Sequence, residues 1–315
     1  MKKHPWLGAV ALVLAVATLG CASEPTADSS GAACNGWAAQ TCGALQKCAP
    51  YTLTSTWGTL ANCTTRRAAV CLAKLQAPGT AASASSVNAC AAAVAAVACS
   101  DIQLLDSLAA CLPKAGSLDV AAACADDSQC ASTRCRITGG SPGQACGTCV
   151  VRAPLGGACA SDADCQGSAK CEATQSIKVC KERVAIGEKC DDSHVCIAPA
   201  TCQSNKCTAP AAVGSKCDLG TKNCDSGAGA YCHDQKELCT AFKSAGEGKS
   251  CNFINGEFVK CDYGLACGDL QAGVGTCHLV PDFGEACSTG DNPPCRAGLV
   301  CDAGLCSVPK FTSCK

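Results

Sequence analysis

The first part of the chain carries apolar residues at helical spacing. A period of about 3.6 residues places one set on a single helix face: Cys34, Trp37, Ala38, Cys42, Leu45 and Cys48. Pro50 ends this run because proline lacks the backbone N–H that a helix interior needs. A second helix is predicted over residues 60–75, and a third from about residue 86 to 99. We therefore predict a helical module over residues 34–120.

Eight cysteines lie in this module, separated by stretches rich in Ala and Leu. A small exported domain with a thin apolar core is usually held together by disulfides. We expect four bridges inside the module. The alanine run at residues 91–98 is too short to span a bilayer and indicates a close-packing helix face.

From Cys124 onward a cysteine repeat replaces the helical pattern. Six units of four cysteines follow one another: Cys124, Cys130, Cys135 and Cys149; Cys159, Cys165, Cys171 and Cys180; Cys190, Cys196, Cys202 and Cys207; Cys217, Cys224, Cys232 and Cys239; Cys251, Cys261, Cys267 and Cys277; Cys287, Cys295, Cys301 and Cys306. Consecutive units are separated by 9, 9, 9, 11 and 9 residues. Residues 121–315 are therefore predicted to form about six tandem disulfide-rich repeats. Cys146 and Cys314 fall outside the scheme, and their partners stay open.

Five units carry a glycine three residues before their first cysteine: Gly156, Gly187, Gly214, Gly248 and Gly284. The first unit has Ala121 at that place. Glycine adopts a positive φ without steric cost, so the pattern predicts a left-handed turn at each unit boundary. Within a unit, four cysteines allow three pairings. We favour first with third and second with fourth, although the sequence does not choose among them.

Composition narrows the fold class. The chain has 35 Cys among 315 residues but only 3% aromatic residues and one Met. This cysteine content indicates a disulfide scaffold and disfavours a large α/β enzyme with a single core. We predict small disulfide-rich repeats, mostly irregular with short β-hairpins, preceded by a small disulfide-stapled all-α module. The 25 Lys and Arg balance 26 Asp and Glu, which gives no electrostatic footprint for nucleic acid.

The N-terminus indicates export. Residues 1–20 have the features of a lipoprotein-type signal peptide, with Lys2 and Lys3 followed by a short apolar stretch. Thr18-Leu19-Gly20-Cys21 resembles a lipobox, which implies a lipid attached to Cys21. The odd number of cysteines favours lipid attachment at Cys21, because the other 35 − 1 = 34 cysteines can then all pair. The alternative is ordinary cleavage after Ala17 and a secreted protein. Residues 21–33 are small and polar, as in a flexible tether.

The spacing within a unit is C-x5-C-x4,5-C, often with Asp in the first gap, as in Cys159-Ala-Ser-Asp-Ala-Asp-Cys165. It resembles the dickkopf N-terminal cysteine-rich region. The order of lipobox-like signal, Ala-rich helical module and tandem four-cysteine units is similar to a group of cysteine-rich lipoproteins from predatory soil bacteria. This resemblance implies an architecture and no activity, and the Wnt antagonism of animal dickkopf proteins is not carried over.

Three segments resemble catalytic motifs, but each lacks a feature that the chemistry of its motif requires. Residues 139–143 match G-x-S-x-G, but Pro142 lacks the N–H that an oxyanion hole needs. Residues 246–250 end like a P-loop, yet Lys243 stands where its first glycine belongs. The C-x-x-C of Cys146 and Cys149 is the one redox candidate, and Pro154 prevents the helix that would activate it. We predict no catalytic residues and no enzyme.

No metal or cofactor is predicted either. His194, His233 and His278 lie near cysteines, but thiols of an exported chain pair with each other. The first gaps of the repeats contain paired aspartates that lack the dense oxygen ligands of a calcium loop: Asp126 and Asp127, Asp162 and Asp164, Asp191 and Asp192. Turn formation explains these aspartates better.

The leading hypothesis is a non-enzymatic, lipid-anchored protein of the outer membrane or cell surface. Its repeats would form an elongated binding or spacer region for an unknown extracellular protein or carbohydrate ligand. The alternative is a protease-inhibitor-like regulator that uses the long loops 136–145 or 252–260. A thiol oxidoreductase at Cys146 and Cys149 is a distant third.

Overall fold

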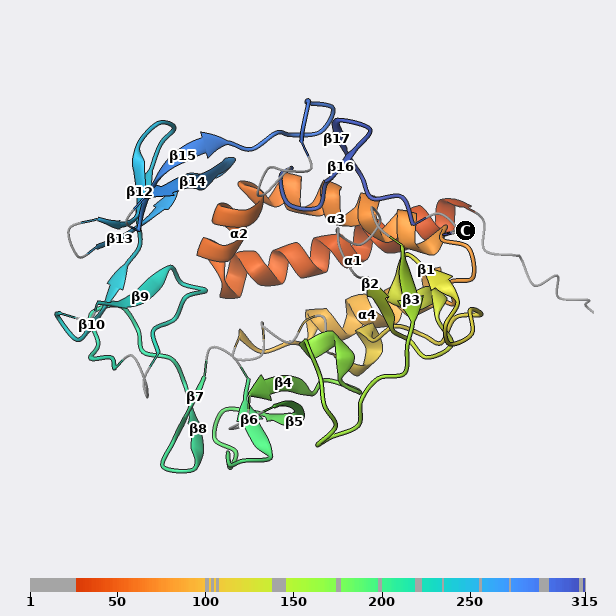
Figure 1. Cartoon of the computed structure of the whole chain (residues 1–315), viewed down its shortest axis with the longest axis horizontal. Coiled ribbons are helices and arrows are strands. Elements are labelled where there is room, and N and C mark those ends of the chain that lie inside the picture. The colour runs from red at the N-terminus through yellow and green to blue at the C-terminus, as the bar shows by residue number, and fades with distance from the viewer. Residues whose placement is uncertain are drawn as a thin grey trace, which may run out of the picture.

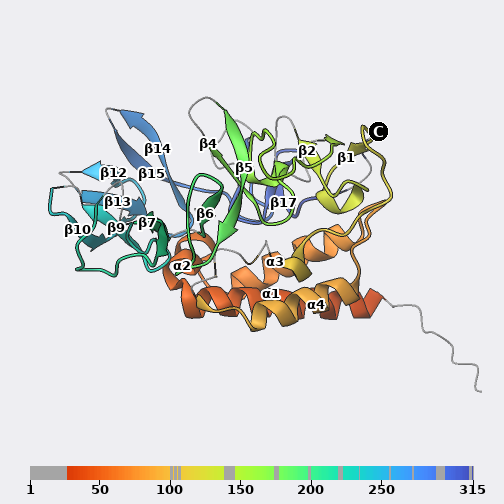
Figure 2. The same cartoon turned by 90° about the horizontal axis from the view of Figure 1, so that it is seen from below.

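The computed structural model describes residues 27–99, 102, 105, 108–137, 146–173, 177–197, 200–218, 223–233, 235–254, 257–271, 273–288, 295–311 and 314. The predicted signal peptide and Cys21 lie outside these residues. Within these residues, four α-helices are gathered in the N-terminal part, and short strands follow them (Figure 1). Figure 2 shows the helices along one side of the molecule and most of the strands along the other. The predicted fold class is confirmed.

The helices are α1 (Ala27–Cys48), α2 (Pro50–Trp57), α3 (Leu60–Leu75) and α4 (Ala84–Ala95), followed by a 3₁₀ turn at Ala109–Cys111. The predicted α3 is confirmed at both ends. Pro50 not only ends α1 but also begins α2, since the first helical position needs no N–H. The helix predicted up to residue 99 stops at Ala95. Among the described residues, no helix is long and apolar enough to cross a membrane.

The start of α1 corrects one boundary. Residues 27–33 are helical, although their composition indicated a flexible tether. Ala33 is only 3% exposed and Cys34 only 1%, so this first part of α1 is already packed. Cys34 is bonded to Cys71 of α3, which fixes the beginning of α1 beside the end of α3.

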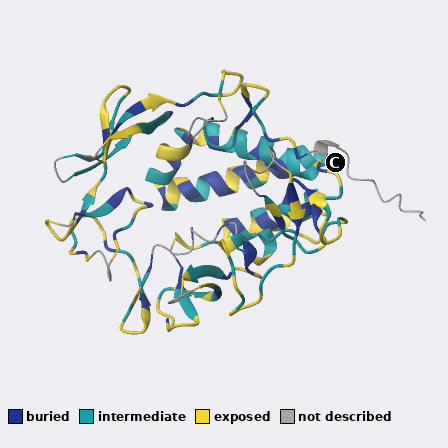
Figure 3. Ribbon diagram, in the orientation of Figure 1, coloured by how far each residue is buried: buried dark blue, intermediate teal, exposed yellow. Residues whose placement is uncertain are grey.

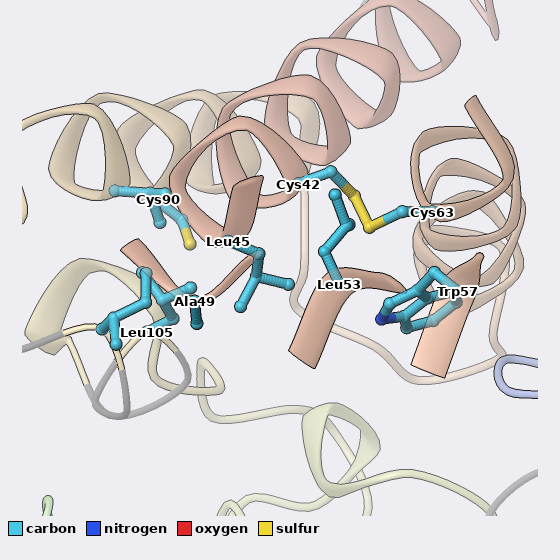
Figure 4. Packing of buried hydrophobic residues seen from close by; sticks show 10 residues of the cluster. Cys42, Leu45, Ala49, Leu53, Trp57, Cys63, Cys90 and Leu105 are labelled. Atoms are coloured by element: carbon cyan, nitrogen blue, oxygen red, sulfur yellow. A yellow bond between two sulfur atoms is a disulfide. The ribbon is translucent and has the colours of Figure 1, made fainter. Parts of the chain in front are cut away.

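Four disulfides inside the helical module confirm the predicted number: Cys34–Cys71, Cys42–Cys63, Cys48–Cys99 and Cys90–Cys111. They surround a core built on Leu45, Leu53 and Trp57. Figure 4 shows these three side chains gathered beside the Cys42–Cys63 bridge. The helices thus combine the expected cystine staples with a modest apolar core.

Each repeat unit contains a short antiparallel hairpin. The strands are β1 (Ala123–Cys124), β2 (Cys135–Ile137), β3 (Gly147–Cys149), β4 (Lys170–Ala173), β5 (Lys178–Val184), β6 (His194–Cys196), β7 (Thr201–Gln203), β8 (Lys206–Thr208), β9 (Ala230–His233), β10 (Leu238–Ala241), β11 (Lys243–Ala245), β12 (Ser250–Ile254), β13 (Glu257–Cys261), β14 (Leu265–Gln271), β15 (Val274–Leu279), β16 (Val300–Asp302) and β17 (Leu305–Ser307). In every unit the third and fourth cysteines stand opposite each other in the hairpin, as Cys301 and Cys306 do.

All six units use the favoured pairing of first with third and second with fourth cysteine. The bridges are Cys124–Cys135 and Cys130–Cys149, Cys159–Cys171 and Cys165–Cys180, Cys190–Cys202 and Cys196–Cys207, Cys217–Cys232 and Cys224–Cys239, Cys251–Cys267 and Cys261–Cys277, Cys287–Cys301 and Cys295–Cys306. Cystines fill the small buried clusters of most units. So many disulfides place the folded chain in an oxidising, extracytoplasmic environment.

The predicted left-handed turn occurs at every unit boundary. The boundary residue has φ between 70° at Gly248 and 93° at Gly187, and its N–H donates to the carbonyl of the last cysteine of the same unit. Ala121 has the same conformation, with φ 71°, and the same bond, 2.8 Å to the Cys149 carbonyl. The geometry is therefore common to all units, whichever residue occupies the position.

Consecutive units also dock in one way. The segment before a unit makes a parallel bridge to that unit's second cysteine, as Ala153 does with Cys165 and Ala211 with Cys224. Equivalent parallel pairs join β5 to β6 and β11 to β13. A repeated docking step of this kind curves the array.

The array curves back over the helices and is not elongated. In Figure 1 the chain passes from β1–β3 through β9–β10 and β12–β15 to β16–β17, around the helical module. The Asn62 amide donates to the Tyr263 hydroxyl at 3.4 Å, and Arg66 pairs with Asp282 at 2.6 Å. Cys146 of the first unit is bonded to Cys314, which closes the arc across 168 residues. The expected elongated region is thus corrected to a closed arc, because these long-range contacts fold it back.

An aromatic cluster fixes the middle of the arc to α2. The Tyr51 ring stacks on Phe242 with centroids 5.3 Å apart, and Phe242 stacks on Tyr231 at 5.4 Å. The Lys260 ammonium lies 3.9 Å from the Phe242 centroid, and burial lowers the pKa of Lys260. Figure 3 shows buried residues along α1, whereas the loops at the outer rim of the arc are largely exposed. The helices and the arc therefore form one packed body.

Candidate ligand-binding cleft

A cleft of about 470 Å³ lies where the helical module meets the two ends of the arc. Helices α1, α3 and α4 and the 110–114 segment supply most of its lining, while Asp126 comes from the first unit and Gly298 from the last. Its volume is within the range of small-molecule sites, about 300–1,000 Å³. The two ends of the arc thus complete a cleft that is lined mostly by the helical module.

Two indoles and a guanidinium form one wall. Trp37 comes from α1, Trp57 from the end of α2 and Arg67 from α3. The Arg67 guanidinium carbon lies 5.7 Å from the Trp37 ring centroid and 5.3 Å from that of Trp57. A cation over an aromatic face is attracted by the ring's quadrupole, so each group holds the other in place.

The last repeat unit closes this wall. Gly298 has φ 81°, and a Cβ built there would lie 3.2 Å from the Trp57 ring. Trp57 is only 8% exposed. The neighbouring Arg66 is tied to the same unit, because its guanidinium pairs with Asp282 and donates to the Ala297 carbonyl at 3.5 Å. The edge of Trp57 is thereby fixed between α3 and the last unit.

Charged groups form the other wall. The Lys74 ammonium lies 2.9 Å from the Asp126 carboxylate, which is 7% exposed. Burial alone would raise the pKa of Asp126, but Lys74 and hydrogen bonds from Ser128 together lower it. Asp126 is therefore ionised and already partnered. Lys114 also lines the cleft, is exposed, and has no carboxylate partner among the described residues.

The first unit places Asp126 by local hydrogen bonds. Asp126 caps the 3₁₀ turn Asp127–Gln129 and accepts from the Ser128 backbone N–H at 3.0 Å. The Gln129 amide oxygen accepts from the Ala125 N–H at 2.7 Å, and its nitrogen donates to the Pro78 carbonyl at 2.8 Å. This turn is thus anchored to the segment after α3.

The paired aspartates form turns, as the sequence indicated. Asp127 accepts from the N–H of Cys135 at 2.7 Å, and Asp162 accepts from the N–H of Cys171 at 2.9 Å. Each therefore orients the third cysteine of its unit. Asp191 binds the His194 ring nitrogen at 2.6 Å.

The cysteines and the other histidines also have structural roles. The triads of cysteine sulfurs that gather within units belong to disulfides, whereas a metal binds thiolate. His278 lies 2.8 Å from Asp269, and His233 is buried beside Tyr231.

The redox candidate is corrected by the pairing. Cys146 is bonded to Cys314 and Cys149 to Cys130, so the C-x-x-C does not form one redox pair. Most of loop 136–145 lies outside the described residues. The loop expected at 252–260 is instead the paired strands β12 and β13 in the middle of a five-stranded sheet. Gly248 forms the boundary turn before Cys251.

No family model, characterised protein or solved structure matches the chain. The cleft must therefore be interpreted from its own chemistry.

Sequence reasoning missed the cleft. The spacing of apolar residues places Trp37 on a helix face, which is correct but does not point to a cleft. A signal was present in the composition, since a chain with 3% aromatic residues has its two tryptophans outside the signal peptide in one module. The wall contributed by Gly298 has no local signature.

Proposed function

We propose that the protein is a non-enzymatic, lipid-anchored binding protein of the bacterial cell envelope whose ligand site is the cleft. The observation that carries this proposal is a cleft of small-molecule size between disulfide-fixed walls, with Trp37, Trp57 and three cations in its lining. A preformed site costs little ordering free energy when a ligand binds. Closure of the arc by Cys146–Cys314 supports a role as a rigid receptor.

The binding role is tested with a matched pair of variants. Ala110 lines the cleft, whereas its neighbour Ala109 is exposed and does not. We expect fluorescent dyes, anilinonaphthalene sulfonate or N-phenyl-naphthylamine, to bind one-to-one and to accept energy from the two tryptophans. Ala110→Phe should abolish this binding, and Ala109→Phe should preserve it. If neither dye binds, or if both variants bind equally, the cleft is not the site.

The anchor is a separate test. An acyl chain contributes about 0.8 kcal/mol per buried CH₂, so a protein acylated at Cys21 stays with membranes through a salt wash. We expect Cys21→Ser to release the protein into the soluble fraction. An intact mass that begins after Ala17 and carries an unmodified Cys21 would refute lipid anchoring and favour the secreted alternative.

A further inference from the structure

Aliphatic side chains supply much of the cleft lining. They come from α3, α4 and the segment after the 3₁₀ turn: Val70, Leu75, Val87, Leu112 and Pro113. These residues are only half-buried, so each keeps apolar surface in contact with solvent. A ligand that covers this surface gains free energy roughly in proportion to the apolar area removed from water.

The indoles leave little room for a flat ligand to stack. The Arg67 guanidinium carbon already lies 5.7 Å from the Trp37 ring centroid and 5.3 Å from that of Trp57. Trp57 is only 8% exposed, and the last unit packs closely against its ring at Gly298. A flat aromatic ligand therefore finds little free indole surface, whereas a flexible chain can follow the aliphatic side chains.

Among the described residues of the lining, most polar side chains are engaged within the protein. Arg67 has a further interaction besides those with the indoles. Lys74 pairs with Asp126 at 2.9 Å, and the Ser128 hydroxyl donates to the same carboxylate at 2.7 Å. The Ser86 side chain belongs to the capping box of α4. A ligand in the cleft therefore gains few hydrogen bonds and depends on apolar contact.

Lys114 differs from these groups. It lines the cleft, is exposed, and has no ion-pair partner within the described part of the chain. Its exposure places the ammonium at the solvent side of the cleft. An exposed ion pair contributes little free energy, so Lys114 can orient an anionic head group without supplying most of the affinity.

We infer that the cleft binds the hydrocarbon chain of a single-chain amphiphile, a fatty acid, and leaves its carboxylate outside beside Lys114. This inference rests on the proposed binding function and specifies its ligand class. A hydrocarbon chain has no polar atom that needs the engaged side chains. A sugar carries hydroxyl groups around its ring, and aliphatic side chains would leave them without partners.

A series of chain lengths tests the ligand class. The oxidised Cys21→Ser form, which carries no acyl chain of its own, is loaded with N-phenyl-naphthylamine. Octanoate, decanoate and dodecanoate are then titrated to displace the dye. Each added pair of CH₂ groups should tighten binding about tenfold, because both groups move from water into the cleft. The comparison ligand is 2-naphthoate, a flat carboxylate, which should bind more weakly than dodecanoate.

The matched alanine variants place the chain in the cleft. Calorimetric titration of dodecanoate should show no binding to Ala110→Phe, because Ala110 lines the cleft. Binding to Ala109→Phe should be normal. Circular dichroism of each variant checks that the helices are intact. Equal binding to both variants would place the fatty acid elsewhere and overturn the inference.

Charge variants test the position of the carboxylate. Lys114→Gln should weaken dodecanoate about twofold to fivefold and leave dodecanol unchanged. Lys178→Gln is the control, since Lys178 is exposed in the second unit and its replacement removes the same charge outside the cleft. Equal weakening by the two variants would overturn the placement beside Lys114.

The outcomes separate the two proposals. Dye binding that Ala110→Phe abolishes, together with displacement that does not depend on chain length, overturns the fatty-acid assignment while the binding function stands. Tighter binding of 2-naphthoate or of dodecanol than of dodecanoate also overturns it, and points to a flat or an uncharged ligand. Failure of every probe overturns the binding function itself.

Discussion

At the scale of single residues, backbone conformation decides which boundary positions tolerate a side chain. Gly214 has φ 83° and open space around its Cα, so an added Cβ would meet no neighbouring atom. Any cost of a side chain there is therefore conformational. Ala121 already bears this cost at φ 71°, and the repeat tolerates it because the bond to the Cys149 carbonyl is kept.

Gly214→Ala should therefore destabilise the oxidised protein by about 1 kcal/mol, since the left-handed region costs an L-residue roughly 1–2 kcal/mol. Gly36→Ala is the matched control, because Gly36 lies in α1 and an added Cβ also meets open space. That change should stabilise the helix by about 0.5–1 kcal/mol. Guanidinium denaturation of the two variants should give shifts of opposite sign. Equal shifts would contradict the conformational explanation.

A second residue-scale effect concerns protons. Asp164 is 3% exposed, and its carboxylate accepts from the N–H groups of Ala160 and Ser161, each at 3.0 Å. Burial opposes ionisation, but these bonds and Arg134 lower the pKa of Asp164 to about 2. Gln129 makes the same two bonds in the first unit with a neutral amide.

Stability should consequently fall in acid through Asp164. Its folded pKa lies below the unfolded value of about 3.9, so the carboxylate contributes fully above about pH 4 and loses its contribution as the pH falls to about 2. The contribution is about 2 kcal/mol. Urea denaturation between pH 2 and 5 should show a weaker pH dependence for Asp164→Asn than for the wild type. An unchanged slope would assign the acid sensitivity to other carboxylates.

At the scale of elements, the Arg152 side chain links the first repeat unit to the second. The Arg152 guanidinium follows the first unit, pairs with Asp127 at 3.0 Å and donates to the Ala163 carbonyl of the second unit at 2.8 Å. It also donates to the Thr133 carbonyl at 2.6 Å. One side chain thus satisfies acceptors in both units, and its planar fork suits this arrangement.

Arg152→Met should cost about 2–4 kcal/mol, because it leaves the half-buried Asp127 carboxylate and the carbonyls of Thr133, Ala163 and Cys165 without this donor. Arg152→Lys should be intermediate, since it keeps the charge but loses the fork. Hydrogen exchange should show the loss at the junction of the first two units, with α1 unchanged. Uniform loss across the molecule would instead indicate a single cooperative fold.

At the scale of the whole molecule, the Cys146–Cys314 bridge closes the arc. Phe311, near this bridge, packs with Ala77 and Ala125, and thereby joins the C-terminal segment to α3 and the first unit. Gly298 of the last repeat unit packs closely against the Trp57 ring. The bridge therefore supports one side of the cleft from a distance.

Replacing Cys146 and Cys314 together by Ser should lower the free energy of unfolding by about 2–4 kcal/mol, the usual range for a disulfide. The other cysteines should still pair within their units and helices. Tryptophan emission should shift to longer wavelength as the last unit moves from Trp57, while the helical circular dichroism stays. Unchanged emission and unfolding would show that packing alone closes the arc.

Local features of the sequence determined the helices, the repeat units and their boundary turns. The spacing of residues 60–75 fixed α3, and the recurrent glycines fixed positive φ, because both depend on neighbours within a few residues. The sequence limited the disulfide pairing within a unit to three possibilities but did not choose among them. The third and fourth cysteines face each other across a hairpin, yet they bond the first and second, which the irregular half of the unit brings underneath.

Only the tertiary structure decided the closure of the arc, the Cys146–Cys314 pairing and the cleft. The contacts concerned join residues far apart in the chain, such as Arg66 with Asp282. Their positions depend on the sum of the rotations between successive units, and a small change in each docking step would carry the last unit away from the helices. No local pattern records that sum. The sequence therefore predicts the modules, and their combined geometry places Gly298 against Trp57.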